Sequence, residues 1–184
     1  MFGREGWDPY LEDSGTLWSL NWQLVRNVEH ASTWNLAFTV YGKNEFTRQE
    51  LTEWIIAHIG DALPKSVSPS SIKRDVDVFV RTYVRSRDQR QGPIEDSFDC
   101  PLVELGLIEE VAPGRYEFPR REFASLPQEI LTYSLLDYWQ RYFPENSTLT
   151  FEQVFIGASS PGAAFRLSEN ALTSRLERLP TWSG

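Results

Sequence analysis

Apolar residues in the first part of the chain recur at the spacing of α-helices. Residues 17–25 are apolar over most of a helical circumference, which predicts a buried helix. A second, shorter helix is expected over residues 34–41. Thr47 and Glu50 stand three positions apart before an apolar run, the spacing of a capping box. They predict the start of a third helix.

A fourth helix is expected from Pro69 to about Val84, because proline is favoured in a first helical turn. Its apolar residues fall at intervals of three and four positions, and they predict the side that faces the core: Ile72, Val76, Phe79, Val80 and Tyr83. Arg74, Arg81 and Arg85 are separated by seven and four residues. This spacing predicts one exposed stripe of arginines along the helix.

Small β elements are expected after the basic helix. Pro101 is a suitable first residue for a short apolar helix, and residues 109–111 and 116–118 flank a turn with the sequence Ala-Pro-Gly-Arg. A helix, a basic helix, a short helix and a hairpin follow one another in this order in winged helix-turn-helix domains. The sequence therefore predicts a mainly α protein with small β elements, a winged helix-turn-helix-like helical domain with a short hairpin.

The last third of the chain is again helical. We expect helices over 128–142 and 151–155, a short strand over 164–167 and a final helix. A soft boundary near Pro119 divides the chain into a winged-helix-like region with the basic stripe, residues 1–118, and a C-terminal helical subdomain packed on it, residues 119–184.

Composition excludes several classes of protein. The 184 residues include no run of 18 apolar residues, and the first residues contain no hydrophobic signal region, so a membrane span and secretion are not expected. One cysteine and two histidines rule out a disulfide framework and a multi-cysteine zinc site. No phosphate-binding glycine loop is present. These features predict a cytoplasmic globular protein.

Charge is distributed unevenly along the chain. The net charge is −8, yet residues 71–90 carry a net +3, which leaves −11 for the remaining positions. An acidic body with one basic segment suits the binding of a polyanion at one place rather than over the whole surface. We therefore interpret the basic residues of this segment as DNA-binding: Lys73, Arg74, Arg81, Arg85, Arg87 and Arg90. The alternative is a solvated face in which Asp75 and Asp77 pair with these cations.

Two groups of carboxylates are candidates for metal-assisted hydrolysis. Glu95, Asp96 and Asp99 follow the basic segment, where Mg²⁺ could bridge carboxylates to phosphate oxygens, and we interpret all three as catalytic. Asp8 and Glu12, together with Asp96 and Asp99, are candidate ligands for Mg²⁺ or Mn²⁺, and no other cofactor is expected. The alternative for both groups is ordinary turn and helix-cap chemistry.

Cys100 precedes Pro101 at an expected helix N-terminus, a position that stabilises a thiolate. It is therefore a candidate reactive thiol. The alternative is an inert, small apolar side chain.

Several strings in one order identify a resemblance to a known family. They are GWDPYLED at 6–13, IKRDVD at 72–77, the segment 95–108 and SSPG at 159–162. Together they resemble the C-terminal domain of the SspB-type DNA nickases of bacterial Ssp phosphorothioation systems, over nearly the entire chain. Asn21 is a departure, because many members of the family have histidine there.

The resemblance implies a role in anti-phage defence, in which sulfur replaces a non-bridging phosphate oxygen of DNA. The implied partners are DNA, a cysteine desulfurase, an ATPase and a reductase-like protein. SspB-type proteins are associated with nicking, so the resemblance implies metal-dependent cleavage of one strand, with Lys73, Arg74 and Arg81 gripping phosphate. The alternatives are a non-catalytic DNA-binding or assembly module that recruits the sulfur-transfer partners, and a sulfur relay through Cys100.

Overall fold

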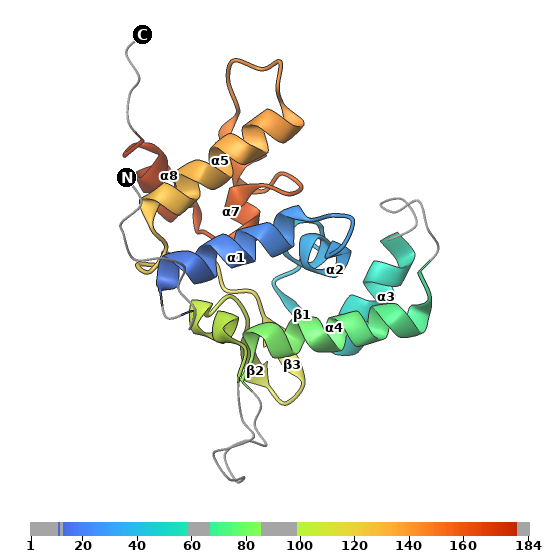
Figure 1. Ribbon diagram of the computed structural model, residues 1–184. Helices are drawn as coiled ribbons and strands as arrows, with labels where there is room; N and C mark the ends of the chain where they lie inside the picture. The colour runs from blue at the N-terminus through green and yellow to red at the C-terminus, as the bar shows by residue number, and fades with distance from the viewer. Residues whose placement is uncertain (1–10, 12, 59–66, 86–98, 180–184) are drawn as a thin grey trace.

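The computed structural model describes residues 11, 13–58, 67–85 and 99–179. The fold is mainly helical with one small antiparallel sheet, as predicted (Figure 1). Within these residues no helix is both long and apolar enough to cross a membrane. The elements are α1 (Ser14–Arg26), α2 (Ser32–Asn35), the π-helical turn η1 (Leu36–Val40), β1 (Glu45–Thr47), α3 (Arg48–His58), α4 (Pro69–Tyr83), the 3₁₀ helix η5 (Pro101–Leu105), β2 (Glu109–Ala112), β3 (Arg115–Glu117), α5 (Gln128–Tyr142), α6 (Phe151–Phe155), α7 (Pro161–Ala164) and α8 (Glu169–Leu176).

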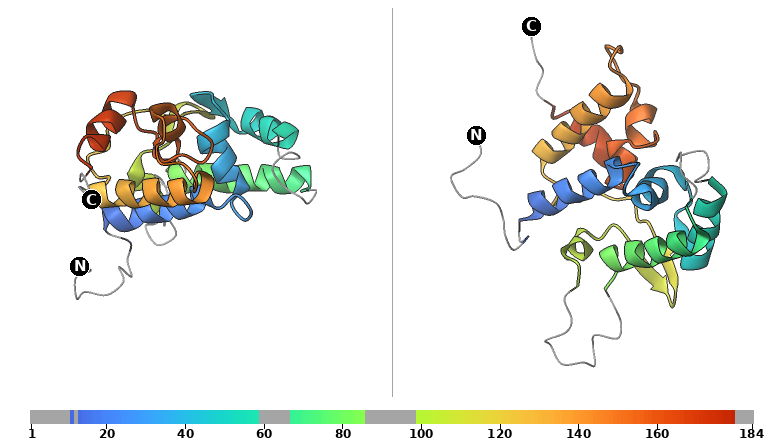
Figure 2. Two further views of the ribbon diagram at one scale, coloured as in Figure 1. Left: turned by 90° about the horizontal axis from the view of Figure 1, so that it is seen from above. Right: turned by 45° about the vertical axis from the view of Figure 1, so that its right-hand side comes forward.

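Helix α1 lies at the centre of the molecule. It contacts α5 and α7 on one side and η5 on the other, while α4 packs against α3 and η5 (Figures 1 and 2). Seen from above, α5 runs alongside α1 (Figure 2). One hydrophobic cluster extends through all these elements. The candidate DNA-binding helix α4 is thus anchored to the core along one side and lies at the periphery along the other.

The core is largely aromatic around α1. Trp18 and Trp22 are fully buried, and the Trp18 ring meets those of Phe123 and Phe165 edge-on, with centroids 5.2 and 5.6 Å apart. The indole N–H of Trp22 donates to Asp137 at 3.1 Å, so this buried donor keeps a hydrogen bond. Residues from both sides of position 119 therefore share one core.

A buried polar bridge also connects distant elements. Asn21 is fully buried in α1; its amide donates to the carbonyl oxygen of Ala164 at 3.2 Å, and its Oδ1 accepts from the Tyr83 hydroxyl at 2.7 Å. Burial raises the pKa of Tyr83 well above its ordinary value, which keeps that hydroxyl a hydrogen-bond donor. Asn21 thus has a structural role here, linking α1 to α4 and α7.

The sheet has the strand order β1-β3-β2, with both pairs antiparallel. The predicted hairpin corresponds to β2 and β3, whereas β1 was not predicted from the sequence. The predicted capping box is confirmed at the junction of β1 and α3. Glu50 Oε2 accepts from the Thr47 N–H at 2.7 Å, and Thr47 Oγ1 accepts from the Glu50 N–H at 3.2 Å. These hydrogen bonds lower the pKa of Glu50 and fix where the helix begins.

The predicted strand over 164–167 is wrong. Residues 161–164 form α7, capped by Ser160, and only Leu167 makes a β-type contact, a single parallel bridge to Arg121. The physical reason is the backbone at Arg166, whose φ of 49° is left-handed and interrupts an extended chain.

Arginines hold the connection between β3 and α5 in place. Arg166 is buried and donates to the carbonyl oxygen of Phe118 at 3.0 Å, while Arg175 donates to those of Phe123 and Leu126 at 2.7 and 2.9 Å. Burial lowers the pKa of Arg166 to about 9, so its guanidinium is still charged at neutral pH. The segment is secured to the C-terminal helices through its backbone.

Candidate nucleic-acid interface

Helix α4 buries the predicted side and thereby determines which residues face outward. Its five predicted core residues are all buried. Ser68 caps the helix by accepting from the Ser71 N–H at 3.2 Å, and Pro69 occupies the first turn as predicted. A helix with one apolar side in the core must present the opposite side to solvent or to a partner.

Three of the predicted DNA-binding cations lie on α4. Lys73, Arg74 and Arg81 are exposed, and among the described residues none has a carboxylate within salt-bridge distance. Asp77 instead pairs with Arg48 of α3, with Nε and Oδ1 3.4 Å apart. Partial burial raises the pKa of Asp75, an effect that the neighbouring Arg74 opposes. Of the two aspartates in the alternative, Asp77 thus pairs with Arg48 rather than with an arginine of α4, while Asp75 interacts electrostatically with Arg74.

Arg85 lies beyond the end of α4. The helix ends at Tyr83 and Val84 has extended backbone, so the helical spacing holds for Arg74 and Arg81 only. Arg85 instead forms ion pairs with Asp99, at 4.0 Å between Nε and Oδ2, and with Glu104. A predicted DNA-binding cation and a predicted catalytic carboxylate are thus neighbours at one end of α4.

The remaining predicted site residues lie outside the described part of the chain: Asp8, Glu12, Arg87, Arg90, Glu95 and Asp96. Within the described part, no group of three histidine, cysteine, aspartate or glutamate residues could hold a metal ion. Of the predicted metal ligands, only Asp99 lies in the described part of the chain. The described residues therefore show no contact between two predicted metal ligands.

Cys100 is half-buried and immediately precedes the five-residue helix η5. Its side chain packs against the hydrophobic cluster, and its carbonyl oxygen accepts from the Val103 N–H at 3.0 Å. These contacts give Cys100 a structural role at the start of η5.

Two hollows adjoin α4. One, of about 360 Å³, lies between α3 and α4 and includes Lys73 in its lining. The other, of about 450 Å³, lies between the end of α4, η5 and the hairpin, and it includes Arg85, Glu109 and Glu110. The basic helix therefore borders recessed surface beside Lys73 and beyond its C-terminal end.

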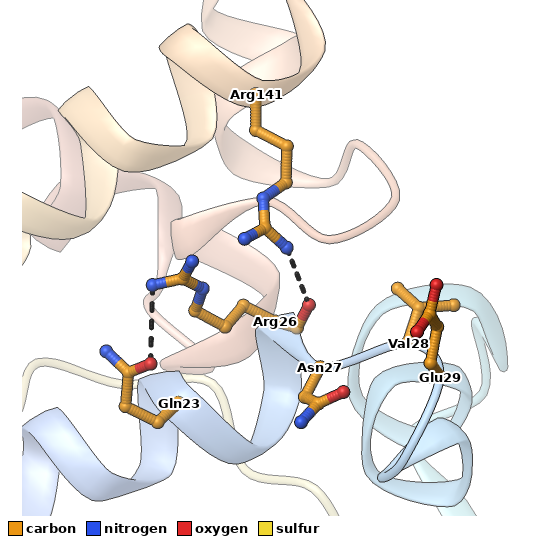
Figure 3. A pocket seen from close by; sticks show the side chains of 6 residues that line it. All are labelled: Gln23, Arg26, Asn27, Val28, Glu29 and Arg141. Carbon is orange, nitrogen blue, oxygen red and sulfur yellow. Dashed lines mark hydrogen bonds between the residues drawn. The ribbon is translucent and has the colours of Figure 1, made fainter.

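A third hollow, of about 450 Å³, lies at the C-terminal end of α1 (Figure 3). Arg26 donates to Gln23 Oε1 at 3.3 Å and pairs with Asp137, while Arg141 of α5 donates to the carbonyl oxygen of Arg26 at 3.2 Å. Sequence reasoning missed this pair of arginines, because their positions are 115 residues apart. Arg141 satisfies a terminal carbonyl of α1, a common use of a cation at a helix end.

The sheet carries carboxylates rather than free cations. Glu45, Glu117 and Glu109 stand in register across the three strands, and like charges directly opposite one another repel. Arg115 pairs with Glu45 at 3.3 Å, and Arg121 pairs with Glu109. The acidic row was not recognised in the sequence because it requires β1.

Two solved structures match this fold. They are described as a crystal structure of SspB and a magnesium ion-bound crystal structure of SspB, and each has a TM-score of 0.81 and 33% sequence identity. Each match covers 97% of this chain and 53% of the SspB chain, so the chain spans about half the length of these relatives. No curated protein matches it. The family described as "Protein of unknown function (DUF4007)" matches residues 1–183, and the chain accordingly belongs to the DUF4007 family.

Proposed function

We propose that the protein is a component of a bacterial DNA phosphorothioate modification and anti-phage defence system, and that it binds duplex DNA through α4. The likeness to SspB structures over 97% of the chain supports the place in such a system. The partners that this role implies are a cysteine desulfurase, an ATPase and a reductase-like protein.

The order of elements supports a winged helix-turn-helix for the DNA-binding part. β1, α3, α4, η5, β2 and β3 follow one another along the chain, and β3 lies between β1 and β2 in the sheet. Helices α3 and α4 pack against each other, and in this proposal they are the helix-turn-helix pair. In this arrangement the second helix of the pair, α4, is the one that enters the major groove.

The single observation that carries the proposal is which cationic side chains of this acidic protein lack a carboxylate partner. Elsewhere in the described residues, most arginines pair with carboxylates or donate to backbone carbonyls: Arg26, Arg48, Arg115, Arg120, Arg121, Arg141, Arg166 and Arg175. The side chain of Arg178, exposed after α8, shows neither contact among the described residues. On α4, by contrast, Lys73, Arg74 and Arg81 are exposed without a described carboxylate partner, although Arg81 Nε donates to the Asp77 carbonyl oxygen of the same helix at 3.3 Å. Cations that are not neutralised within the protein are available to phosphate.

Duplex DNA binding at several salt concentrations tests this proposal. If Lys73, Arg74 and Arg81 each neutralise one phosphate, the plot of log K against log salt has a slope of about −2.7. Fluorescence anisotropy of a labelled duplex measures both affinity and slope. A chain that is folded by circular dichroism and does not bind DNA at low salt would refute the proposal.

Metal-dependent nicking is a second candidate function. It is favoured by the ion pair between Asp99 and Arg85, because a nuclease needs carboxylates next to a cation that holds phosphate. A related SspB structure is described as magnesium ion-bound. The described residues do not fit a metal centre by themselves, since Asp99 is already paired with Arg85 and no group of three potential ligands is described. The proposed catalytic set therefore depends on Glu95 and Asp96.

Asp99→Asn is expected to reduce Mg²⁺-dependent conversion of supercoiled plasmid to open circles to the level without protein. Glu104→Gln is the matched control, because Glu104 also contacts Arg85 but is not a proposed catalytic residue. Agarose gels with and without EDTA measure the conversion. Equal losses in both variants would indicate that the carboxylates only position Arg85, and unchanged nicking by Asp99→Asn would remove Asp99 from the catalytic set.

A further inference from the structure

Val78 is an exposed apolar residue on the outward side of α4, and 41% of its surface is accessible. Arg74 precedes it by four residues and Arg81 follows it by three, so both arginines are its neighbours on the outer surface of the helix. The exposed Asp75 is a third neighbour, three residues before Val78. The two arginines are separated by roughly 10 Å along the helix axis. Val78 is therefore a methyl-bearing patch between two cations that have no described carboxylate partner.

Isolated exposed apolar residues are common and need no explanation by themselves. Val78 is distinguished by its surroundings, because α4 already has a complete buried side that contributes to the core. The valine adds nothing to that side. Its flanking arginines also make an uncharged protein partner unfavourable, because their charges would have to be desolvated.

The charge of the neighbouring hairpin supports contact through the helix. The acidic row of Glu45, Glu109 and Glu117 would repel phosphate, and the arginines nearest to it are already paired. In a winged helix-turn-helix the hairpin commonly lies beside the helix that enters the groove. A polyanion is therefore expected to contact α4 rather than the acidic row, because α4 carries the exposed cations.

We propose that Val78 contacts the C5 methyl group of a thymine in the major groove and so makes α4 prefer thymine at one position. This inference rests on the proposed DNA binding by α4. Thymine is the one standard base that presents a methyl group in the major groove, and apolar side chains recognise it by direct contact. Arg74 and Arg81 bind phosphates, or the major-groove edge of guanine, on either side of this contact.

Competition between two duplex pools of identical random sequence tests the inference. One pool contains thymine and the other uracil, which lacks the methyl group. The wild-type chain is expected to bind a thymine-containing site about fourfold more tightly, the value for burial of one methyl group. Val78→Ala is expected to abolish this preference and Val78→Ile to keep it. In a third pool, uracil replaces thymine and 5-methylcytosine replaces cytosine. This pool identifies the base that supplies the methyl group.

Each outcome has one meaning. If neither pool binds, the proposed DNA binding fails together with the inference. If both pools bind equally well, or Val78→Ala keeps the preference, DNA binding stands and thymine recognition is overturned. If the chain binds the pool with 5-methylcytosine more tightly than the pool with uracil alone, and does not prefer the thymine pool, thymine as the target is overturned. Arg74→Gln should weaken binding of both pools and leave their ratio unchanged, which separates phosphate contact from methyl recognition.

Discussion

Replacing Arg74 and Arg81 together by glutamine is expected to weaken duplex DNA binding by at least about 100-fold, because each of the two charge-assisted hydrogen bonds to phosphate contributes about 1.5–3 kcal/mol. The negative salt slope should also become shallower by about 1.8. Both side chains are exposed on α4 and support no part of the core, so the fold should be retained. Anisotropy titrations at three salt concentrations measure affinity and slope, and circular dichroism confirms folding.

The matched control removes the same charge elsewhere. Arg115 lies on the hairpin, paired with Glu45, and Arg178 follows α8. Glutamine at these two positions should weaken binding only by the small effect of net charge. An equal loss in the control variant would show that DNA responds to overall charge and would remove α4 as the interface.

Trp18→Ala is expected to lower the free energy of unfolding by about 3–5 kcal/mol, the cost of deleting a fully buried aromatic side chain. The ring is in contact with Phe123 and Phe165, so its loss leaves a cavity between α1 and the C-terminal part of the chain. Urea unfolding, followed by far-ultraviolet circular dichroism and by the fluorescence of the remaining tryptophans, measures the change.

Leu20→Ala serves as its control, since Leu20 lies on the same helix and is 38% exposed. It should cost much less than Trp18→Ala. The shared core predicts that both probes of the Trp18→Ala variant follow one transition. Two separate transitions would instead support independent units on either side of position 119.

Local signals allowed most helices to be predicted. Thr47 and Glu50 supply both halves of a reciprocal cap, and this interaction is complete within four residues. The apolar spacing of α4 gave its buried side for the same reason, because 3.6-residue periodicity is a property of the helix itself. Arg74 and Arg81 were then placed on the outer side by geometry alone.

What could not be predicted depends on distant partners. β1 has only three residues and exists because Phe46 pairs with Tyr116, 70 positions later. The predicted stripe includes Arg85, because a sequence period does not reveal that α4 ends at Tyr83. Within the candidate site, the sequence predicts Asp99 as a catalytic carboxylate, but its pairing with Arg85 depends on the fold. The structural arginines were likewise indistinguishable from surface cations.

The segment between β3 and α5 has the sequence of a polar loop, yet its hydrogen bonds constrain the number of residues in it. The Arg121 N–H donates to the carbonyl oxygen of Arg166 at 3.2 Å, and the Ser168 N–H donates to that of Arg121 at 3.2 Å. An inserted residue before Phe123 would shift the Phe123 and Leu126 carbonyl oxygens relative to Arg175, which donates to both. During divergence within the family, substitutions should therefore be tolerated in this segment more readily than insertions or deletions.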